Sequence, residues 1–402
     1  MRKLSRTRVG YRIKQTVRQR TWHSAAGPTR PAPTRPRASS GPVRNVLLVS
    51  HGDFTTNSGL HVHAIASELA VRGYSPVVAL PGRGFGLAEV GPAAFPVVSH
   101  RDARGGRLEF PSGGYADLVH AFTPRSPVRS VALAAAQAAG CSYVVHLEDD
   151  DARIAGGTPA AARDAFVAGS AGMTVVIERL LELKPDRLPG AVVWPGFDES
   201  VFSPARASGD VRRDLGLEEG EIVLVYTGNV HETNLDAMRE LYLAVALLRR
   251  SGVRAVLVKT GWNFVPDALL PRLGNGIRDL GWVARRHIPD LLQAADVLVQ
   301  PGAPGGIDDY RFPSKLPDFL ASGKPVVAPR TNIGLHLLDG VEALLLDRGD
   351  ATEIAGKVKV AAAAADLRKA IGAAGQVFAR RELRWKSGVA RIADLYVASR
   401  RG

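Results

Sequence analysis

This 402-residue sequence has a single cysteine, Cys141. One cysteine excludes an internal disulfide and is typical of proteins from a reducing compartment. Long apolar runs are also missing, since none approaches the roughly 20 residues that a helix needs to span a bilayer. The basic N-terminus lacks the apolar stretch that a secretory signal peptide requires. These absences predict a cytoplasmic protein without a membrane-spanning helix.

Acidic residues are absent from the first 44 positions, which contain twelve Lys or Arg. The rest of the chain has 40 basic and 39 acidic residues, so the net charge of +13 comes almost entirely from this segment. Residues 24–43 are rich in Ala, Pro, Ser and Thr, a composition typical of a disordered linker. We therefore predict a basic, disordered tail over residues 1–43.

Four interpretations of this tail remain open. It is a solvated extension, an Arg-rich transit peptide, a nucleic-acid-binding arm or an anchor on an anionic membrane surface. The anchor would use residues 1–23, where Trp22 and several aliphatic residues lie among the bases. Each base near such a surface contributes about 1 kcal/mol, and the protein would then lie peripherally at the inner face of the membrane. Nucleic acid is the weaker of these partners, because the neutral body offers no further basic stripe.

The remaining chain alternates between strand-like apolar runs and helical segments. Its length, with 46% hydrophobic and 23% charged residues, suits two globular domains. Strands are predicted within residues 45–54 and 221–229, and at 76–80, 118–121, 143–147, 191–193, 255–259, 277–281, 297–300 and 326–327. Helices are predicted within 57–74 and at 128–139, 158–168, 179–183, 235–250, 287–294 and 316–322. This alternation predicts two doubly wound α/β domains with parallel sheets.

The domain boundaries are predicted from turn-rich segments. The first Rossmann-like domain covers residues 44–200 and the second covers 201–384, with a linker at about 197–210. Residues 385–402 form a last amphipathic helix. Its apolar stripe consists of Trp385, Val389, Ile392, Leu395 and Tyr396.

The segment 308–325, DDYRFPSKLPDFLASGKP, follows one of the predicted strands. A helix that begins just beyond the carboxyl end of a strand points its backbone N–H groups into the crevice where α/β proteins bind ligands. Near that N-terminus, Asp318 can accept hydrogen bonds from a ribose hydroxyl pair, while Lys315 and Arg311 can bind phosphates. The segment therefore predicts half of a nucleotide-sugar site.

The same segment resembles the acidic motif of retaining GT-B glycosyltransferases, glycosyltransferase family 4, also called glycosyl transferases group 1. In that family two Glu separated by seven residues precede A-x-G-x-P-V. Here Asp318 matches the second acid, Tyr310 occupies the position of the first, and Asp308 or Asp309 is the candidate substitute. The resemblance covers most of residues 45–400 and implies two Rossmann-like domains facing an interdomain cleft, with the last helix crossing back to the first domain.

Three motifs of the first half also resemble the family. Gly59 lies in a loop similar to the Gly-Gly turn before the first long helix, although Ser58 replaces the first Gly, and it is expected near the donor pyrophosphate. His120 resembles the histidine that approaches the donor sugar, with Phe122 at the position of a second His; the alternative is a buried, structural His. Residues 195–204, PGFDESVFSP, resemble the interdomain signature N-G-V-D-x-x-x-F-x-P.

The second half carries the remaining donor candidates. Gly228 and Asn229 stand where the family commonly has Gly-Arg, and Asn234 stands where a Lys follows; both family cations bind the pyrophosphate. The cations left for this task are Lys315, Arg311 and Lys259. Val283 ends a G-x-V turn whose backbone contacts the base in the family, and the backbone near Gly334 is a further phosphate candidate.

Three roles remain open for the acidic run at residues 148–151. It contacts acceptor hydroxyls, it caps a helix, or it is a solvated loop. Use of such acids as a hydrolytic pair is another possibility, although nothing in the sequence marks a proton donor.

The resemblance implies transfer of a sugar, with retention, from a nucleotide-diphosphate donor to a glycan, a glycolipid or a cell-envelope precursor. The expected catalytic residues are His120, Lys315 and Asp318. No D-x-D motif or His/Asp cluster demands a metal, so neither a metal nor a separate cofactor is expected. The main alternative is a catalytically inactive GT-B-like protein that binds a nucleotide or a glycan, and an epimerase or phosphorylase is a third.

Overall fold

The computed structural model describes residues 42–400, apart from 83–85, 87–89, 92, 106–107, 109, 154–157, 198 and 200–207. Residues 1–41 of the predicted tail therefore lie outside the described residues, as does most of the predicted linker. Within the described part of the chain, no helix is long and apolar enough to cross a membrane.

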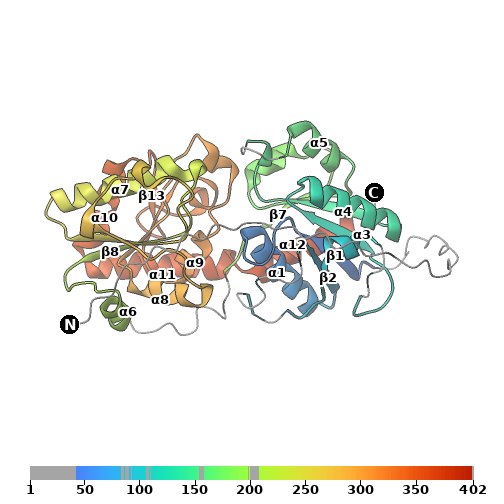
Figure 1. Ribbon diagram of the computed structural model, residues 1–402, viewed down its shortest axis with the longest axis horizontal. Coiled ribbons are helices and arrows are strands. Elements are labelled where there is room, and N and C mark those ends of the chain that lie inside the picture. Colours follow the sequence, from blue (N-terminus) through green and yellow to red (C-terminus); the bar gives the residue numbers. More distant parts are fainter. Residues whose placement is uncertain are drawn as a thin grey trace, which may run out of the picture. The chain divides into compact units, whose positions relative to one another are not determined.

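The first sheet contains seven strands among the described residues, all paired in parallel. They are β1 (Asn45–Val49), β2 (Ser75–Leu80), β3 (Val97–Ser99), β4 (Leu118–Phe122), β5 (Ser142–Leu147), β6 (Met173–Val175) and β7 (Gly190–Val192). Their order across the sheet is β3-β2-β1-β4-β5-β6-β7. Strands β1, β2 and β7 are labelled in Figure 1. The helical segments are α1 (Asn57–Val71), α3 (His100–Arg104), α4 (Ser126–Ala139), η1 (Asp151–Arg153), α5 (Ala160–Ala168) and η2 (Glu178–Leu183).

The second sheet contains six parallel strands in the order β10-β9-β8-β11-β12-β13, again among the described residues. They are β8 (Ile222–Thr227), β9 (Ala255–Thr260), β10 (Ile277–Asp279), β11 (Val297–Val299), β12 (Val326–Pro329) and β13 (Leu344–Leu346). The longer helices are α6 (Ser208–Asp214), α7 (Leu235–Arg250), α8 (Ile288–Ala294), α9 (Leu316–Ala321), α10 (Ala351–Ala363) and α11 (Ala365–Glu382). Short 3₁₀ turns are η3 (Glu232–Asn234), η4 (Asp267–Leu269), η5 (Gly274–Gly276), η6 (Arg285–His287), η7 (Ile307–Tyr310) and η8 (Asn332–His336).

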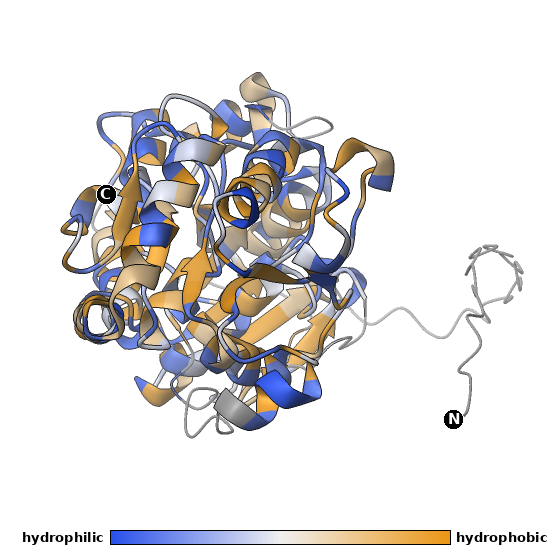
Figure 2. Cartoon of the chain, turned by 90° about the vertical axis from the view of Figure 1, so that its left-hand side faces the viewer, coloured by the Kyte–Doolittle hydropathy of each residue, from blue (hydrophilic) through white to orange (hydrophobic). Residues whose placement is uncertain are grey.

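Both sheets form because their strands are continuous apolar runs. The β1 sequence NVLLV and the β9 sequence AVLVKT are buried at every position. A strand that is covered on both faces needs such a run, and helices that follow each strand supply the cover. Figure 2 shows the strands mainly in the colours of hydrophobic residues, as this arrangement requires. The fold prediction of two doubly wound parallel-sheet domains is confirmed.

The last helix, α12 (Trp385–Ala398), packs against α1 and β7 of the first sheet domain. Val389, Ile392 and Tyr396 are fully buried there, next to core residues such as Val46 and Ile65. The stripe that predicts one apolar face on this helix therefore contacts the core of the first domain.

Two predicted helices differ from the structure. Residues 179–183 belong to a 3₁₀ helix, η2, and the helix predicted from residue 158 begins at Ala160 after Pro159. Proline favours the first turn of a helix over its interior, which explains the later start. Strands β3, β6 and β13, each of three residues, are missing from the predicted set.

Candidate functional site

The donor side of the candidate site lies at the carboxyl ends of β8, β11 and β12 in the second sheet domain. After β11 the chain forms η7 and then α9, whose first turn includes Pro317. Leu316, Phe319 and Leu320 are buried, which confirms the predicted apolar face of this helix. Burial of that face fixes the helix start, and with it the residues that precede and follow it.

Lys315 caps the N-terminus of α9 and lies against the loop after β8. A Cβ atom at Gly228 would come within 2.8 Å of Lys315 Cε, so the Lys315 side chain lies directly against this glycine. Lys315 Nζ lies 5.0 Å from the centre of the Tyr226 ring. Burial, and after it the positive charge of Arg311, lower the pKa of Lys315 to about 7, while the negative charge of Asp308 opposes this shift. An anion bound nearby would therefore stabilise the protonated form of Lys315.

The backbone of Arg311, like Lys315, lies in the segment after β11, and the buried side chain of Asn332 holds it in place. Asn332 Nδ2 donates hydrogen bonds of 2.7 Å to the carbonyl oxygens of Asp308 and Arg311. Asn332 is buried and has a φ of 48°, a left-handed conformation that asparagine tolerates better than most residues. Gly334, two residues later, lies so close to Pro329 that a Cβ atom there would overlap the Pro329 carbonyl oxygen. The loop after β12 thus positions the backbone of the segment that contains Arg311.

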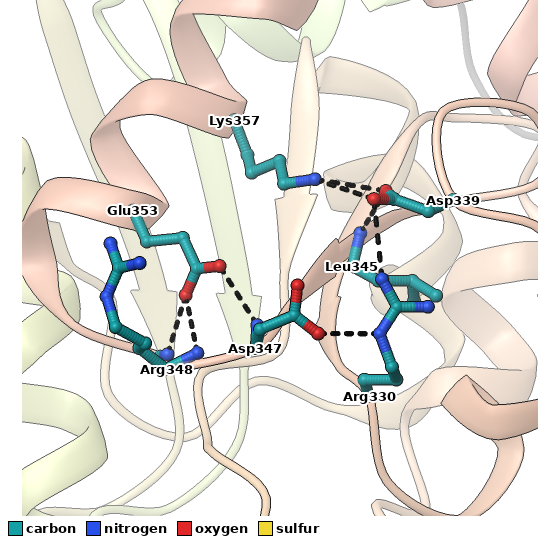
Figure 3. Close-up of polar contacts among 8 residues, drawn as sticks. Arg330, Asp339, Leu345, Asp347, Arg348, Glu353 and Lys357 are labelled. Carbon is teal, nitrogen blue, oxygen red and sulfur yellow. Dashed lines mark hydrogen bonds and ion pairs between the residues drawn. The ribbon is translucent and has the colours of Figure 1, made fainter.

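A polar network fixes the loops after β12 and β13 (Figure 3). Arg330 forms ion pairs with Asp347 at 2.6 Å and Asp339 at 3.5 Å, and Lys357 of α10 lies 2.9 Å from Asp339. Glu353 accepts hydrogen bonds from three consecutive backbone N–H groups, those of Asp347, Arg348 and Gly349. This network supports the loop that contains Asn332 and Gly334.

Asp318 lies one turn after Lys315, in the first turn of α9. Its carboxylate lies 3.8 Å from a guanidinium nitrogen of Arg285, in η6. Arg285 is not among the predicted site residues, although the basic run Arg285–His287, directly after the predicted G-x-V turn, is a signal for it. Asp318 and Lys315 therefore lie at the same helix start, with Arg285 as an additional cation.

The two asparagines at the family's cation positions organise the loop after β8. Asn234 Nδ2 donates to the carbonyl oxygen of Asn229 at 3.0 Å and to Tyr226 Oη at 3.3 Å. Asn229 Oδ1 accepts a hydrogen bond of 2.8 Å from the backbone N–H of Trp262. Both side chains are thus used within the protein, and they contribute no positive charge for a pyrophosphate.

Lys259 lies in a different environment from the one predicted. Its side chain is fully buried in β9, and its Nζ donates to the carbonyl oxygen of Gly261 and pairs with Asp279 at 3.4 Å. The prediction that Lys259 binds phosphate is corrected to a structural role, because its charge is already compensated inside the domain. Val283 is packed beside Leu291 and Ala294, so only its backbone is a candidate for ligand contact.

The loop of Gly59 lies at the start of α1 in the first sheet domain. A Cβ at Gly59 would overlap the carbonyl oxygen of Asp53, so the close packing requires glycine. The Gly59 N–H already donates to Thr56 Oγ1 at 3.1 Å, where Thr56 is the N-cap of the helix. The geometry therefore explains the glycine by packing, and the predicted pyrophosphate contact gains no support from it.

His120 is fully buried, and both of its ring nitrogens have partners. Its Nδ1 lies 2.8 Å from Tyr396 Oη, and its Nε2 lies 3.1 Å from Thr174 Oγ1. Burial lowers the pKa of His120 well below its ordinary value, with His146 as a second cause. The structure corrects the prediction that His120 faces a sugar, because the ring is enclosed by the core; the buried, structural alternative fits it.

A second polar group lies at the carboxyl ends of β1, β4 and β5. Glu148 Oε1 lies 2.6 Å from His61 Nδ1, and Thr123 Oγ1 donates to Glu148 Oε2 at 2.7 Å. Burial opposes ionisation of this carboxyl, but His61 and Thr123 prevail and lower the pKa of Glu148 to about 2. Burial and the neighbouring Glu148 raise the pKa of Asp149 to about 7, against the attraction of Arg311.

The segment that contains Tyr310 contacts this polar group directly. Asp149 and Arg311 form an isolated antiparallel bridge, and the backbone N–H of Asp150 donates to the Tyr310 carbonyl oxygen at 3.3 Å. Arg153 lies 4.0 Å from the centre of the Tyr310 ring, and Arg179 donates to its hydroxyl at 3.1 Å. At the position of the family's first acid, this chain therefore has a residue that joins the donor segment to η1 and η2.

Known proteins resemble this chain in sequence and in fold. Residues 221–363 match the family model described as glycosyl transferases group 1. A D-inositol 3-phosphate glycosyltransferase from Streptomyces scabiei is 26% identical over 301 residues, which are 70% of this chain and 63% of the relative. A protein of the same name from Xylanimonas cellulosilytica is 31% identical over 252 residues, 59% of this chain and 57% of that one. The chain thus spans about three fifths of the length of these relatives.

Solved structures match over a larger share. The Anabaena protein HepE in complex with UDP has a TM-score of 0.66 and 17% identity, over 87% of this chain and 98% of that one. A glycosyltransferase from Rickettsia africae has a TM-score of 0.69 and 13% identity, over 90% of this chain and 99% of that one. These likenesses show the GT-B fold, and the resemblance to glycosyl transferases group 1 is confirmed.

Proposed function

We propose that this protein is a glycosyltransferase that moves a sugar from a nucleotide-diphosphate donor to a hydroxylated acceptor, with retention of the anomeric configuration. The observation that supports this proposal best is the group formed by Lys315, Arg311 and the Gly228 loop at the carboxyl edge of the second sheet. An α/β protein binds ligands at this edge, and a diphosphate needs cations there.

The proposed chemistry depends on charge at the leaving group. As the bond from the sugar to the diphosphate breaks, negative charge grows on the departing oxygen. Lys315 gains a proton or keeps one more readily as that charge develops, because burial and the neighbouring Arg311 charge hold its pKa at about 7 until an anion compensates them. Asp318 would accept hydrogen bonds from the ribose hydroxyls. Glycosyltransferases that close around their substrates exclude water and so limit hydrolysis of the donor.

The acceptor would bind beside the polar group at the edge of the first sheet. Glu148 is ionised and already held by His61 and Thr123, so it is a fixed acceptor of hydrogen bonds. His51 follows β1, and its buried Nδ1 has no hydrogen-bond partner among the residues that the structure describes. Burial lowers the pKa of His51, and Arg125 adds to this effect while Glu148 opposes it, so the ring is neutral at pH 7. Such groups suit a polyhydroxylated acceptor, and the names of the relatives make a phosphorylated inositol the first one to test.

A donor panel tests the proposal. Purified protein is incubated with UDP-, GDP- and ADP-linked hexoses, with and without inositol phosphates, and release of the nucleoside diphosphate is measured. Transfer to an acceptor supports the proposal, and NMR of the product reports whether the configuration is retained. Release of no nucleoside diphosphate from any donor, in the presence of measurable nucleotide binding, would contradict it.

A second candidate function is favoured by Asn229 and Asn234. These residues carry no charge, and the Asn234 side chain donates a hydrogen bond to the backbone carbonyl oxygen of Asn229. The donor pyrophosphate would therefore meet fewer cations than the family usually provides. A GT-B-like protein that binds a nucleotide or a glycan without turnover would show this pattern. Binding of a nucleotide without release of nucleoside diphosphate from any sugar donor would support this second candidate.

Asp318→Ala is expected to weaken binding of the donor nucleotide. Loss of hydrogen bonds to a charged group costs about 1–3 kcal/mol, which corresponds to roughly 5- to 150-fold in affinity. Isothermal titration with the nucleoside diphosphate measures the change. Asp366→Ala on the exposed surface of α11 is the matched control and should leave the affinity unchanged. Equal affinities for Asp318→Ala and the unmodified protein would remove Asp318 from the site.

Chelation of divalent ions is expected to leave turnover largely intact. No group of three or more His, Cys, Asp or Glu side chains suited to a metal ion occurs among the described residues. Initial rates with and without EDTA provide the measurement. A loss that is complete and is restored by Mg²⁺ or Mn²⁺ would show that the reaction needs a metal.

A further inference from the structure

The side chain of Tyr310, in η7 of the second sheet domain, lies between two arginines of the first. The guanidinium carbon of Arg153, in η1, lies 4.0 Å from the centre of the Tyr310 ring, and that of Arg179, in η2, lies 5.1 Å from it. A guanidinium over an aromatic face is attracted by the negative charge of the π system. Arg179 also donates a hydrogen bond of 3.1 Å to the Tyr310 hydroxyl. Tyr310 is therefore bound to the first sheet domain through both its ring and its hydroxyl.

Both sides of this contact are fixed within their own domains. On the first domain, the buried carboxylate of Asp150 accepts a hydrogen bond of 2.9 Å from Arg153 Nε and also pairs with Arg163 of α5. On the second domain, the side chain of Asn332 holds the backbone on either side of Tyr310 by two hydrogen bonds of 2.7 Å. The Tyr310 contacts therefore fix an edge of one domain relative to an edge of the other.

The backbone around Tyr310 brings the two proposed substrate edges together. The Asp150 N–H donates to the Tyr310 carbonyl oxygen at 3.3 Å, and Asp149 forms an isolated antiparallel bridge with Arg311. Arg311 belongs to the proposed donor side, and Asp149 belongs to the acidic run at the proposed acceptor side. Where the edges meet, the acids are largely withdrawn from water, since the Glu148 side chain is 10% exposed and Asp150 is 5% exposed. The joined edges thus shield the proposed site from bulk water.

We propose that Tyr310 is a positioning residue that keeps the donor and acceptor edges joined before any substrate binds, and so favours transfer of the sugar over hydrolysis of the donor. This inference rests on the proposed function, because it assigns one edge to a donor and the other to an acceptor. Water competes with the acceptor for the sugar, and joined edges exclude it. Tyr310 acts through the positions of Arg311 and Asp149, without contact with the sugar. The residue at the position of the family's first acid therefore serves to assemble the site.

Hydrogen exchange of the protein without substrate tests whether Tyr310 joins the two edges. The exchange rate of the Asp150 amide reports how often the contact opens. Tyr310→Ala removes the ring and the hydroxyl together and is expected to speed this exchange about 10- to 100-fold. Tyr310→Phe keeps the ring over the guanidinium groups, so its rate should stay within about threefold of the unmodified protein. Tyr115→Ala in the first sheet domain, where the residue is 50% exposed, is the matched control and should leave the rate unchanged.

Arg179→Met provides a second check on the same contact. It should speed exchange of the Asp150 amide in the otherwise unmodified protein and add little in the Tyr310→Ala protein, because the contact is already lost there. Circular dichroism confirms that each variant is folded. Unchanged exchange in Tyr310→Ala, or effects of the two substitutions that simply add, would overturn the inference.

Product analysis tests the consequence for the reaction. With a donor and an acceptor that are turned over in the donor panel, free hexose reports hydrolysis and glycosylated acceptor reports transfer, and both routes release the same nucleoside diphosphate. Tyr310→Ala should raise the ratio of free hexose to transfer product about tenfold or more, since a larger fraction of the protein is open to water. Tyr310→Phe and Tyr115→Ala should leave this ratio near that of the unmodified protein.

The outcomes separate this inference from the proposed function. An unchanged ratio in a Tyr310→Ala protein that still transfers sugar would overturn the positioning role, while the proposed function would stand. If the unmodified protein releases no nucleoside diphosphate from any donor, the proposed function fails, and the exchange rates alone decide whether Tyr310 joins the two edges.

Discussion

Replacing Lys315 with methionine is expected to lower the turnover number about 100- to 1,000-fold. Removal of one preorganised group that stabilises developing negative charge commonly costs about 2.7–4 kcal/mol in the transition state. Nucleotide affinity should fall by less, because the charge on the leaving oxygen is greater in the transition state than in the bound donor. Methionine is one atom shorter than lysine but still reaches the position of Lys315 Cε beside Gly228, so most of the packing there is preserved. Steady-state kinetics and calorimetry on the same variant separate the two effects.

A surface lysine serves as the control for this substitution. Lys359→Met removes a charge from an exposed position of α10, which makes no contact with the proposed donor site. Its turnover should remain within about threefold of the unmodified protein. A Lys315 variant with normal turnover would exclude this residue from the leaving-group side of the reaction.

The pH dependence of nucleotide binding follows from the same residue. In the free protein Lys315 is charged below pH 7 and loses its proton above it, since its pKa is about 7. A bound diphosphate favours the charged form, so affinity should fall as the pH rises above about 7. Asp149, whose pKa is also raised to about 7, gains negative charge over the same interval and acts in the same direction. Lys315→Met should remove most of the fall, and Asp149→Asn should remove the remainder.

His120→Ala is expected to destabilise the protein strongly. The substitution leaves Tyr396 Oη without its imidazole partner and opens a cavity at a fully buried position, while Thr174 Oγ1 keeps His146 Nδ1 as a partner at 2.7 Å. Each unsatisfied buried polar group costs about 1–3 kcal/mol, and the cavity adds to this, so a loss of about 3–5 kcal/mol in the free energy of unfolding is expected. Urea denaturation measures this loss, and activity should fall together with the folded fraction.

The exposed His287 provides the control, because its replacement by alanine should change stability by less than about 0.5 kcal/mol. A His120→Ala protein with normal stability and at least tenfold lower turnover would restore the predicted role of His120 at the sugar. The two outcomes are separated by measuring unfolding and turnover on one preparation.

Much of the donor side could be predicted from local sequence. Pro317 and Gly323 mark the ends of α9, and the spacing of Leu316, Phe319 and Leu320 predicts which face is buried. These signals lie within ten residues of one another, so they determine the local structure without information from elsewhere in the chain. The placement of Lys315 and Asp318 at one helix start follows from them.

The remaining errors come from contacts between distant residues. His120 is paired with Tyr396, which lies 276 positions later, and no local pattern reveals whether a histidine at a strand end turns inward or outward. Lys259 was predicted to be a phosphate ligand because its type suits that task, but its neutralising partner, Asp279, comes from the next strand. Arg285 and the contacts of Tyr310 were missed for the same reason.

The path of α12 has a consequence for how the chain folds during synthesis. Val389, Ile392 and Tyr396 complete the core around β1 and α1, so the first domain to leave the ribosome lacks part of its interior until the last helix emerges. The second sheet domain has its own strands and core and needs no such delay. Domains generally fold in the order of synthesis. Here we expect the second domain to complete its core before the first domain does. In ribosome-bound chains that stop before residue 385, a protease should therefore cut the first domain and leave the second domain intact.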